Sequence, residues 1–151
     1  MAMKLESWMS LASLGLSAMF VALLLSFFNF LIGPDGAGPG RVVEPGSLLL
    51  QFVFISAAPS LVLAGFVYGM ARPYGTRTGG MLLVASGVIM MAGMAVATLM
   101  LPKIDDQYIV GAVGYAPYFF LGAGAGVAAV GGYLLAISGR RAHYTNLDDL
   151  L

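Results

Sequence analysis

Four long apolar runs dominate the chain, and none of them contains Asp, Glu, Lys, Arg or His. A helix needs about 20 mostly apolar residues to cross the hydrocarbon core of a bilayer, and each run reaches that length. The pattern therefore predicts an all-α integral membrane protein: a bundle of four transmembrane helices joined by short loops. The uncharged runs cover residues 11–32, 47–71, 78–102 and 107–139.

We expect the whole chain, residues 1–151, to form a single membrane domain, because four spans leave no room for a separate soluble one. Composition agrees, since 60% of the residues are hydrophobic and 9% are charged, whereas soluble domains are about 25% charged. The expected transmembrane helices cover residues 10–32, 47–71, 79–102 and 109–138, with a tail at 139–151.

Positive charge is divided unequally between the two sides of this bundle. Both termini share one side, which carries five of the seven Lys and Arg residues, and the other side carries Arg41 and Lys103. Because short cytoplasmic loops are enriched in Lys and Arg, we expect both termini in the cytoplasm and the chain in the cell (plasma or inner) membrane. The residues expected to anchor the bundle at the cytoplasmic interface are Trp8, Arg72, Arg77, Arg140 and Arg141.

The last span is rich in glycine, with seven between residues 111 and 132. Small residues let helix backbones approach closely in a membrane, where packing replaces the hydrophobic force. We expect a face of small residues to lie against another helix; its members are Gly122, Ala125, Gly126 and Ala129. The opposite face also has small residues, Gly124, Ala128 and Gly131. One face would pack on the chain's own bundle and the other on a partner subunit.

Serine and proline shape the first two spans and the last. Buried hydroxyls can bond between helices, and each such bond is worth about 0.6 kcal/mol in a membrane bundle. The proline ring removes a backbone donor, so we expect kinks at Pro59 in the second span and Pro117 in the last. The serines expected at helix-packing interfaces are Ser13, Ser17, Ser56 and Ser60.

The third span holds five of the ten methionines. We interpret them as flexible packing residues, although thioethers also suit Cu(I) and Met90 and Met94 are the candidate ligands. Together with Gly122 and Gly126 they form an MxxxM and GxxxG pattern that is similar to copper transporters of the Ctr family. That resemblance implies copper handling. The Met/His-rich outer segment of such transporters is missing, and four spans replace three.

Side chains that carry chemistry are nearly absent. The chain has no Cys, its single His, His143, lies in the tail, and the expected spans contain no carboxylate. This excludes thiol chemistry, a haem held by two His and a proton-coupled exporter with a membrane carboxylate. There is also no basic surface for nucleic acid. We expect no catalytic residue, cofactor site or metal site of the chain's own, and we expect bound lipids.

By elimination, the sequence favours a non-catalytic accessory subunit of a larger integral membrane complex, such as a respiratory or membrane-bound oxidoreductase or monooxygenase. The chain would not be an enzyme alone but would belong to a hetero-oligomer. The alternative is a small homo-oligomeric transporter or channel for an uncharged or lipid-like substrate. Copper handling through Met90 and Met94 is a third hypothesis.

Overall fold

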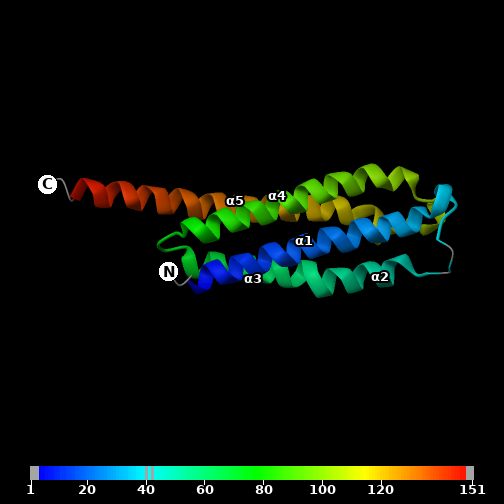
Figure 1. Cartoon of the computed structure of the whole chain (residues 1–151), viewed down its shortest axis with the longest axis horizontal. Helices are drawn as coiled ribbons and strands as arrows, with labels where there is room; N and C mark the ends of the chain where they lie inside the picture. The colour runs from blue at the N-terminus through cyan, green and yellow to red at the C-terminus, as the bar shows by residue number, and fades with distance from the viewer. Residues whose placement is uncertain (1–3, 40, 42, 149–151) are drawn as a thin grey trace.

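The computed structural model describes residues 4–39, 41 and 43–148, and all regular structure in that part of the chain is helical. Helices α2 and α3 are joined by a π-helical turn, Val53–Ala57, into one continuous segment (Figure 1). The helices are α1 (Leu5–Ile32), α2 (Pro45–Phe52), α3 (Ala58–Ala71), α4 (Arg77–Met100) and α5 (Gly111–Asp148).

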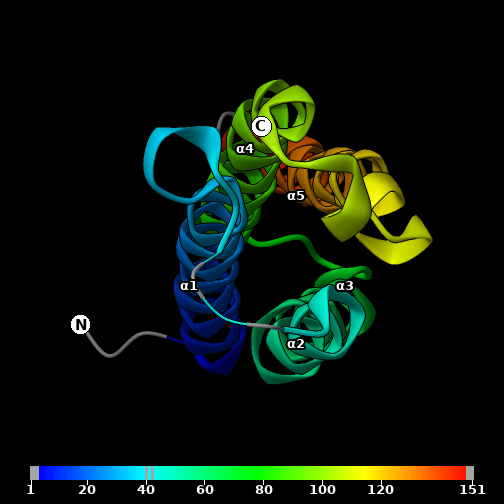
Figure 2. The same cartoon turned by 90° about the vertical axis from the view of Figure 1, so that its right-hand side faces the viewer.

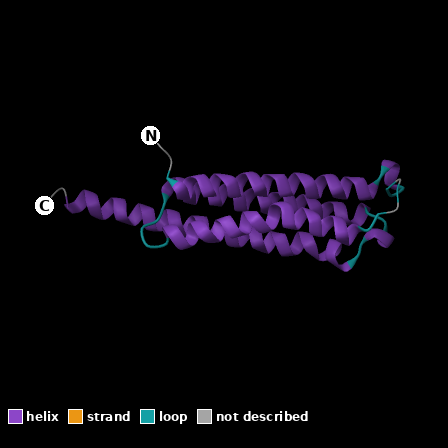
Figure 3. Cartoon of the chain, turned by 90° about the horizontal axis from the view of Figure 1, so that it is seen from below, coloured by secondary structure: helices purple, strands orange, loops and turns teal. Residues whose placement is uncertain are grey.

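Four helical segments are long and apolar enough to cross a membrane, which confirms the predicted all-helical class and the number of spans. These segments are Leu5–Ile32, Pro45–Ala71, Arg77–Lys103 and Gly111–Arg141. They run side by side, and the start of α1 and the end of α5 lie at the same end of the bundle (Figures 1 and 3).

Two helix boundaries differ from those predicted by more than two residues. The first helix begins at Leu5 rather than at residue 10, and it includes Glu6 in its first turn, where a carboxylate interacts favourably with the helix dipole. The last helix continues through Arg140 and Arg141 to Asp148, so the expected tail is helical as far as it is described. The physical reason is that hydropathy marks the edge of the bilayer, whereas a helix ends only where its backbone bonding ends.

Helix α4 lies between α1 and α5 and contacts both extensively, while α3 packs mainly on α1. Helices α3 and α5 touch much less. In the view along the bundle, α1 and α4 form one row, with α5 beside α4 and α3 beside α1 (Figure 2). The side between α3 and α5 is therefore the least closed side of the bundle.

Glycine brings the backbones of α4 and α5 into contact. A Cβ added at Gly87 would lie 2.5 Å from both the Ala128 nitrogen and the Gly124 carbonyl oxygen. Such an approach is closer than real Cβ atoms tolerate, so only glycine fits at this crossing. The small-residue face of α5 that includes Gly124 and Gly131 is thus the face that packs inside the chain.

A cluster of aromatic and aliphatic side chains fills the end of the bundle away from the termini. The Phe20 and Phe120 rings lie 4.6 Å apart between centroids and join α1 to α5. Met90 and Met94 are buried in the same cluster. Both methionines therefore occupy packing positions in the interior.

The π-helical turn directly precedes α3, whose second residue is Pro59. Proline cannot donate to the carbonyl four residues earlier, and a π-helical turn shifts the bonding by one residue, as in the bond from the Ala58 nitrogen to the Val53 carbonyl. The Ser56 hydroxyl donates to the Phe52 carbonyl at 2.6 Å. Pro117 is buried inside α5, which continues past it.

Candidate helix-docking site

Four buried hydroxyls join α1, α3 and α4 in the interior, and we call Ser13, Ser17, Ser60 and Ser86 the serine clasp. The Ser13 hydroxyl donates to the Ser60 carbonyl at 2.9 Å, and the Ser60 hydroxyl donates to the Ser13 carbonyl at 2.9 Å. The Ser17 oxygen lies 2.6 Å from that of Ser60 and 2.7 Å from that of Ser86. Ser17 of α1 is therefore the link between α3 and α4.

The serine clasp is a positional constraint rather than a reactive site. All four hydroxyls are buried, and no buried side-chain nitrogen or oxygen in the described part of the chain lacks a hydrogen-bond partner. A hydroxyl left unpaired at this depth would cost free energy. Sliding α1 along either neighbour would break these bonds, so the clasp fixes the register of the three helices.

An apolar groove runs between α3 and α5 on the least closed side of the bundle, and we call it the outer groove. Its volume is about 310 Å³. Each helix lines it with residues at positions i, i+3, i+4 and i+7, the spacing of one helix face. The lining residues are Leu61, Ala64, Gly65 and Tyr68 of α3, and Ala123, Gly126, Val127 and Val130 of α5.

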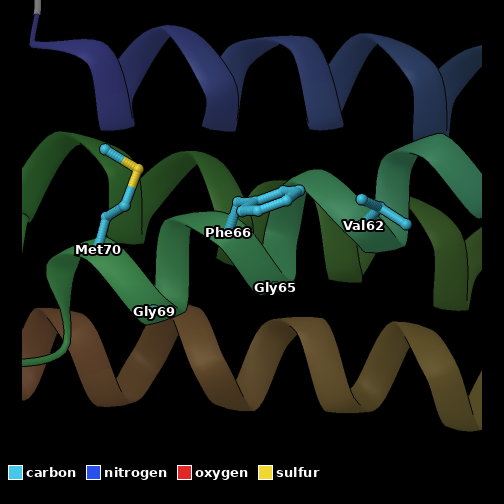
Figure 4. A pocket seen from close by; sticks show the side chains of 5 residues that line it. All are labelled: Val62, Gly65, Phe66, Gly69 and Met70. Carbon is cyan, nitrogen blue, oxygen red and sulfur yellow. The ribbon is translucent and has the colours of Figure 1, made fainter.

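A second depression, of about 400 Å³, adjoins the outer groove on α3 and shares Gly65 with it. In Figure 4 the side chains of Val62, Phe66 and Met70 project from one edge of α3, and Gly65 and Gly69 lie on the side nearer α5. Nothing lies within 4 Å of a Cβ added at Gly65 or Gly69. The helix backbone is therefore bare along this strip.

Aromatic rings close one end of the outer groove. The Tyr68 and Tyr133 rings lie 6.1 Å apart between centroids, so they bridge α3 and α5. The Arg72 guanidinium lies 5.8 Å from the Tyr68 ring centroid, a cation–π distance. This closed end is the end at which the chain begins, where the interface residues are expected.

The predicted packing residues fall into two groups. Ser13, Ser17 and Ser60 meet in the serine clasp, whereas Ser56 bonds only to its own helix. The predicted face of α5 is exposed in this chain, and nothing lies within 4 Å of a Cβ added at Gly122 or Gly126. Contact between that face and another helix therefore stays a prediction about a partner; its members are Gly122, Ala125, Gly126 and Ala129.

The predicted interface anchors lie at the end of the bundle that holds the termini. Trp8 is exposed at the end of the first turn of α1, and Arg77 is the first residue of α4. Arg140 is exposed on α5. The Arg141 guanidinium donates to the Pro73 carbonyl at 2.8 Å and so ties α5 to the loop between α3 and α4.

Sequence reasoning missed Ser86 and the Gly65 and Gly69 pair. Ser86 lies seven residues after Gly79 and four before Met90, on the buried face of α4. That spacing could have placed Ser86 in the interior, although not beside Ser17. Gly65 and Gly69 have the same four-residue spacing as Gly122 and Gly126. The shared spacing could have indicated a matching face on the second span.

The four spans and the buried hydroxyl clasp indicate a multi-pass membrane protein with a helical-bundle architecture. Comparison with protein-family models, curated proteins and solved structures finds no match for this chain.

We predict that Ser17→Ala lowers the free energy of unfolding in detergent by about 1 kcal/mol, because it removes the links to Ser60 and Ser86. Ser26→Ala, at an exposed position of the same helix, is the matched control and should change stability little. Reversible unfolding followed by circular dichroism measures both variants. Equal stability of the two variants would contradict a role of the clasp in holding the helices.

Proposed function

We propose that this chain is a non-catalytic structural subunit of a larger integral membrane complex, and that a transmembrane helix of another subunit fills the outer groove. The observation that supports the proposal is the groove itself. It is apolar, and its rims on α3 and α5 are exposed glycine backbone. A respiratory or membrane-bound oxidoreductase or monooxygenase is the kind of assembly we have in mind.

Exposed glycine is costly unless something packs on it. Glycine is about 1 kcal/mol less favourable than alanine in a soluble helix, and in a membrane its advantage appears when another backbone comes close. Inside this chain, Gly87 uses that advantage against α5. Gly65 and Gly126 have no such neighbour among the residues that the structure describes, so a helix from outside would supply it.

The shape of the outer groove suits a helix. Both walls present side chains at the spacing of one helix face over about two turns, and ridges of side chains on one helix pack into grooves on another. The floor is formed by Ala64 and Val127, which are buried, and the rims by Gly65 and Gly126, which are exposed. An incoming helix would therefore meet a low rim and an apolar floor.

A second copy of the chain is the alternative occupant. The bare glycine rows of α3 and α5 border the same groove, so one copy can present a row to the groove of another. That arrangement would favour a homo-oligomeric transporter or channel for an uncharged or lipid-like substrate. Copper handling is the third hypothesis, and it would use Met90 and Met94 in the interior.

The orientation that we propose has both termini in the cytoplasm of a cell that holds the chain in its plasma or inner membrane. The support is the five-to-two excess of Lys and Arg on the terminal side. Tyr74→Cys and Ala37→Cys place single thiols on exposed loops at opposite ends of the bundle. In intact cells an impermeant maleimide should label the thiol at position 37 and leave that at 74 unlabelled, and the reverse labelling would refute this orientation.

We predict that Gly126→Leu and Gly65→Leu each abolish co-purification of the partner subunit from the native host, because a leucine side chain would fill the outer groove. The chain itself should still fold, since nothing lies within 4 Å of either position. Mild-detergent purification followed by native electrophoresis measures the size of the complex.

Gly15→Leu is the matched control for these variants. Gly15 is exposed on α1 and nothing lies within 4 Å of it, so the same substitution there should leave the complex intact. If the complex of the two groove variants kept its size, the docking proposal would be refuted. A discrete assembly made of this chain alone would favour the homo-oligomer.

A further inference from the structure

A pocket of about 340 Å³ lies between the start of α4 and the part of α5 that leaves the bundle. Its lining residues are Arg77, Leu135, Ser138 and Gly139. Figure 1 shows α5 continuing beyond the loop between α3 and α4, at the end where the chain begins and ends. The pocket therefore lies at the edge of the apolar spans, at the depth expected for lipid headgroups.

Arg77 lines the pocket, and the end of the bundle at which the pocket lies is rich in basic residues. The basic residues at this end are Lys4, Arg72, Arg77, Arg140 and Arg141. Among the side chains that the structure describes at this end, Glu6 is the one carboxylate, and it is only 6% exposed. The charge on Arg77 is thus not balanced by an exposed carboxylate within the described part of the chain, and an anion from outside would be attracted.

The walls of the pocket are held in place. The hydrogen bond from Arg141 to the Pro73 carbonyl joins α5 to the loop that leads into α4. The Thr76 hydroxyl accepts from the Gly79 nitrogen at 3.2 Å and caps the start of α4. Close backbone contact between Gly80 and Gly131 fixes the two helices one turn further into the membrane. The pocket is therefore preformed in the absence of a ligand.

The surface below the pocket is apolar. Met81 lies one turn after Arg77 on α4 and is 58% exposed. Leu135 lies one turn before Gly139 on α5 and lines the pocket. At the headgroup level, the surface between α4 and α5 carries the Arg77 guanidinium and the Ser138 hydroxyl. Deeper in the bilayer, the same surface is hydrocarbon. A basic, polar site above an apolar surface is complementary to an amphiphile with an anionic head.

We propose that this pocket binds the phosphate of an anionic membrane phospholipid. Arg77 would donate charge-assisted hydrogen bonds to the phosphate oxygens, and Ser138 would donate a further one. An acyl chain would lie over Met81 and Leu135. Basic pockets between transmembrane helices on the cytoplasmic side are known lipid-headgroup sites. This site is independent of the outer groove, so it stands whether or not a partner subunit binds there.

The test uses the purified full-length chain, stripped of lipid in mild detergent. Thermal unfolding is followed while phosphatidylglycerol, phosphatidylcholine or inorganic phosphate is added at equal concentrations. A ligand that binds the folded state raises the unfolding midpoint. Phosphatidylglycerol should raise it clearly, phosphatidylcholine much less, and inorganic phosphate hardly at all, because the acyl chain contributes to binding.

Arg77→Gln should weaken the apparent affinity for phosphatidylglycerol about tenfold. Arg41→Gln, an exposed arginine at the opposite end, is the matched control and should respond like the unaltered chain. Equal responses of the two variants would overturn the assignment. A full shift from inorganic phosphate alone would contradict a lipid ligand and point to a soluble anion.

Native mass spectrometry covers the case in which Arg77→Gln is too unstable to purify. Ser138→Ala removes one donor from the same pocket and should lower the number of phosphatidylglycerol molecules retained by the chain. Unchanged retention in Ser138→Ala would also overturn the proposal.

Discussion

Close approach of helix backbones is the constraint on which the rest of this structure depends. Lipid chains are as apolar as the helix surfaces, so the hydrophobic effect does not drive helices together within the bilayer, and van der Waals contact and interhelical hydrogen bonds must do so. Glycines on α4 and α5 provide that contact, because a Cβ at Gly87 or Gly131 would meet backbone atoms of the opposite helix at 2.5 Å and 2.7 Å. Helices α4 and α5 are thus the most closely packed pair of the bundle.

The serine clasp attaches the other helices to this pair in one register. Ser17 joins α1 to both Ser60 of α3 and Ser86 of α4. Helix α3 therefore packs mainly on α1 and makes little contact with α5. The outer groove is the consequence of that arrangement. The rims of the groove, at Gly65 and Gly126, are exposed glycine backbone. The same kind of surface packs α4 on α5 inside the chain. The proposed subunit role rests on this repetition.

Hydropathy was sufficient to predict the fold class and the number of spans, because the cost of burying charge in lipid is large compared with any local preference. It could not predict helix ends, since a helix such as α5 continues into water wherever its backbone bonds are maintained. The serine bonds of α1 and α3 were foreseeable from Ser13, Ser17 and Ser60, but not their link to Ser86, because one sequence does not show which helices are neighbours.

The two small-residue faces of α5 look alike in sequence. Only the positions of α4 and α3 show that Gly124 and Gly131 pack within the chain while Gly122 and Gly126 are exposed.

Adjacent glycines on α5 allow the most direct test that backbone contact organises the bundle. A Cβ at Gly131 would lie 2.7 Å from the Gly80 carbonyl oxygen and the Val84 nitrogen, whereas nothing lies within 4 Å of a Cβ at Gly132. The measurement is the free energy of unfolding of Gly131→Ala and Gly132→Ala in the same detergent. Gly131→Ala should lose about 1–3 kcal/mol through overpacking, and Gly132→Ala should be unchanged or slightly more stable because alanine favours the helix. Equal effects, or a larger loss in Gly132→Ala, would contradict this account.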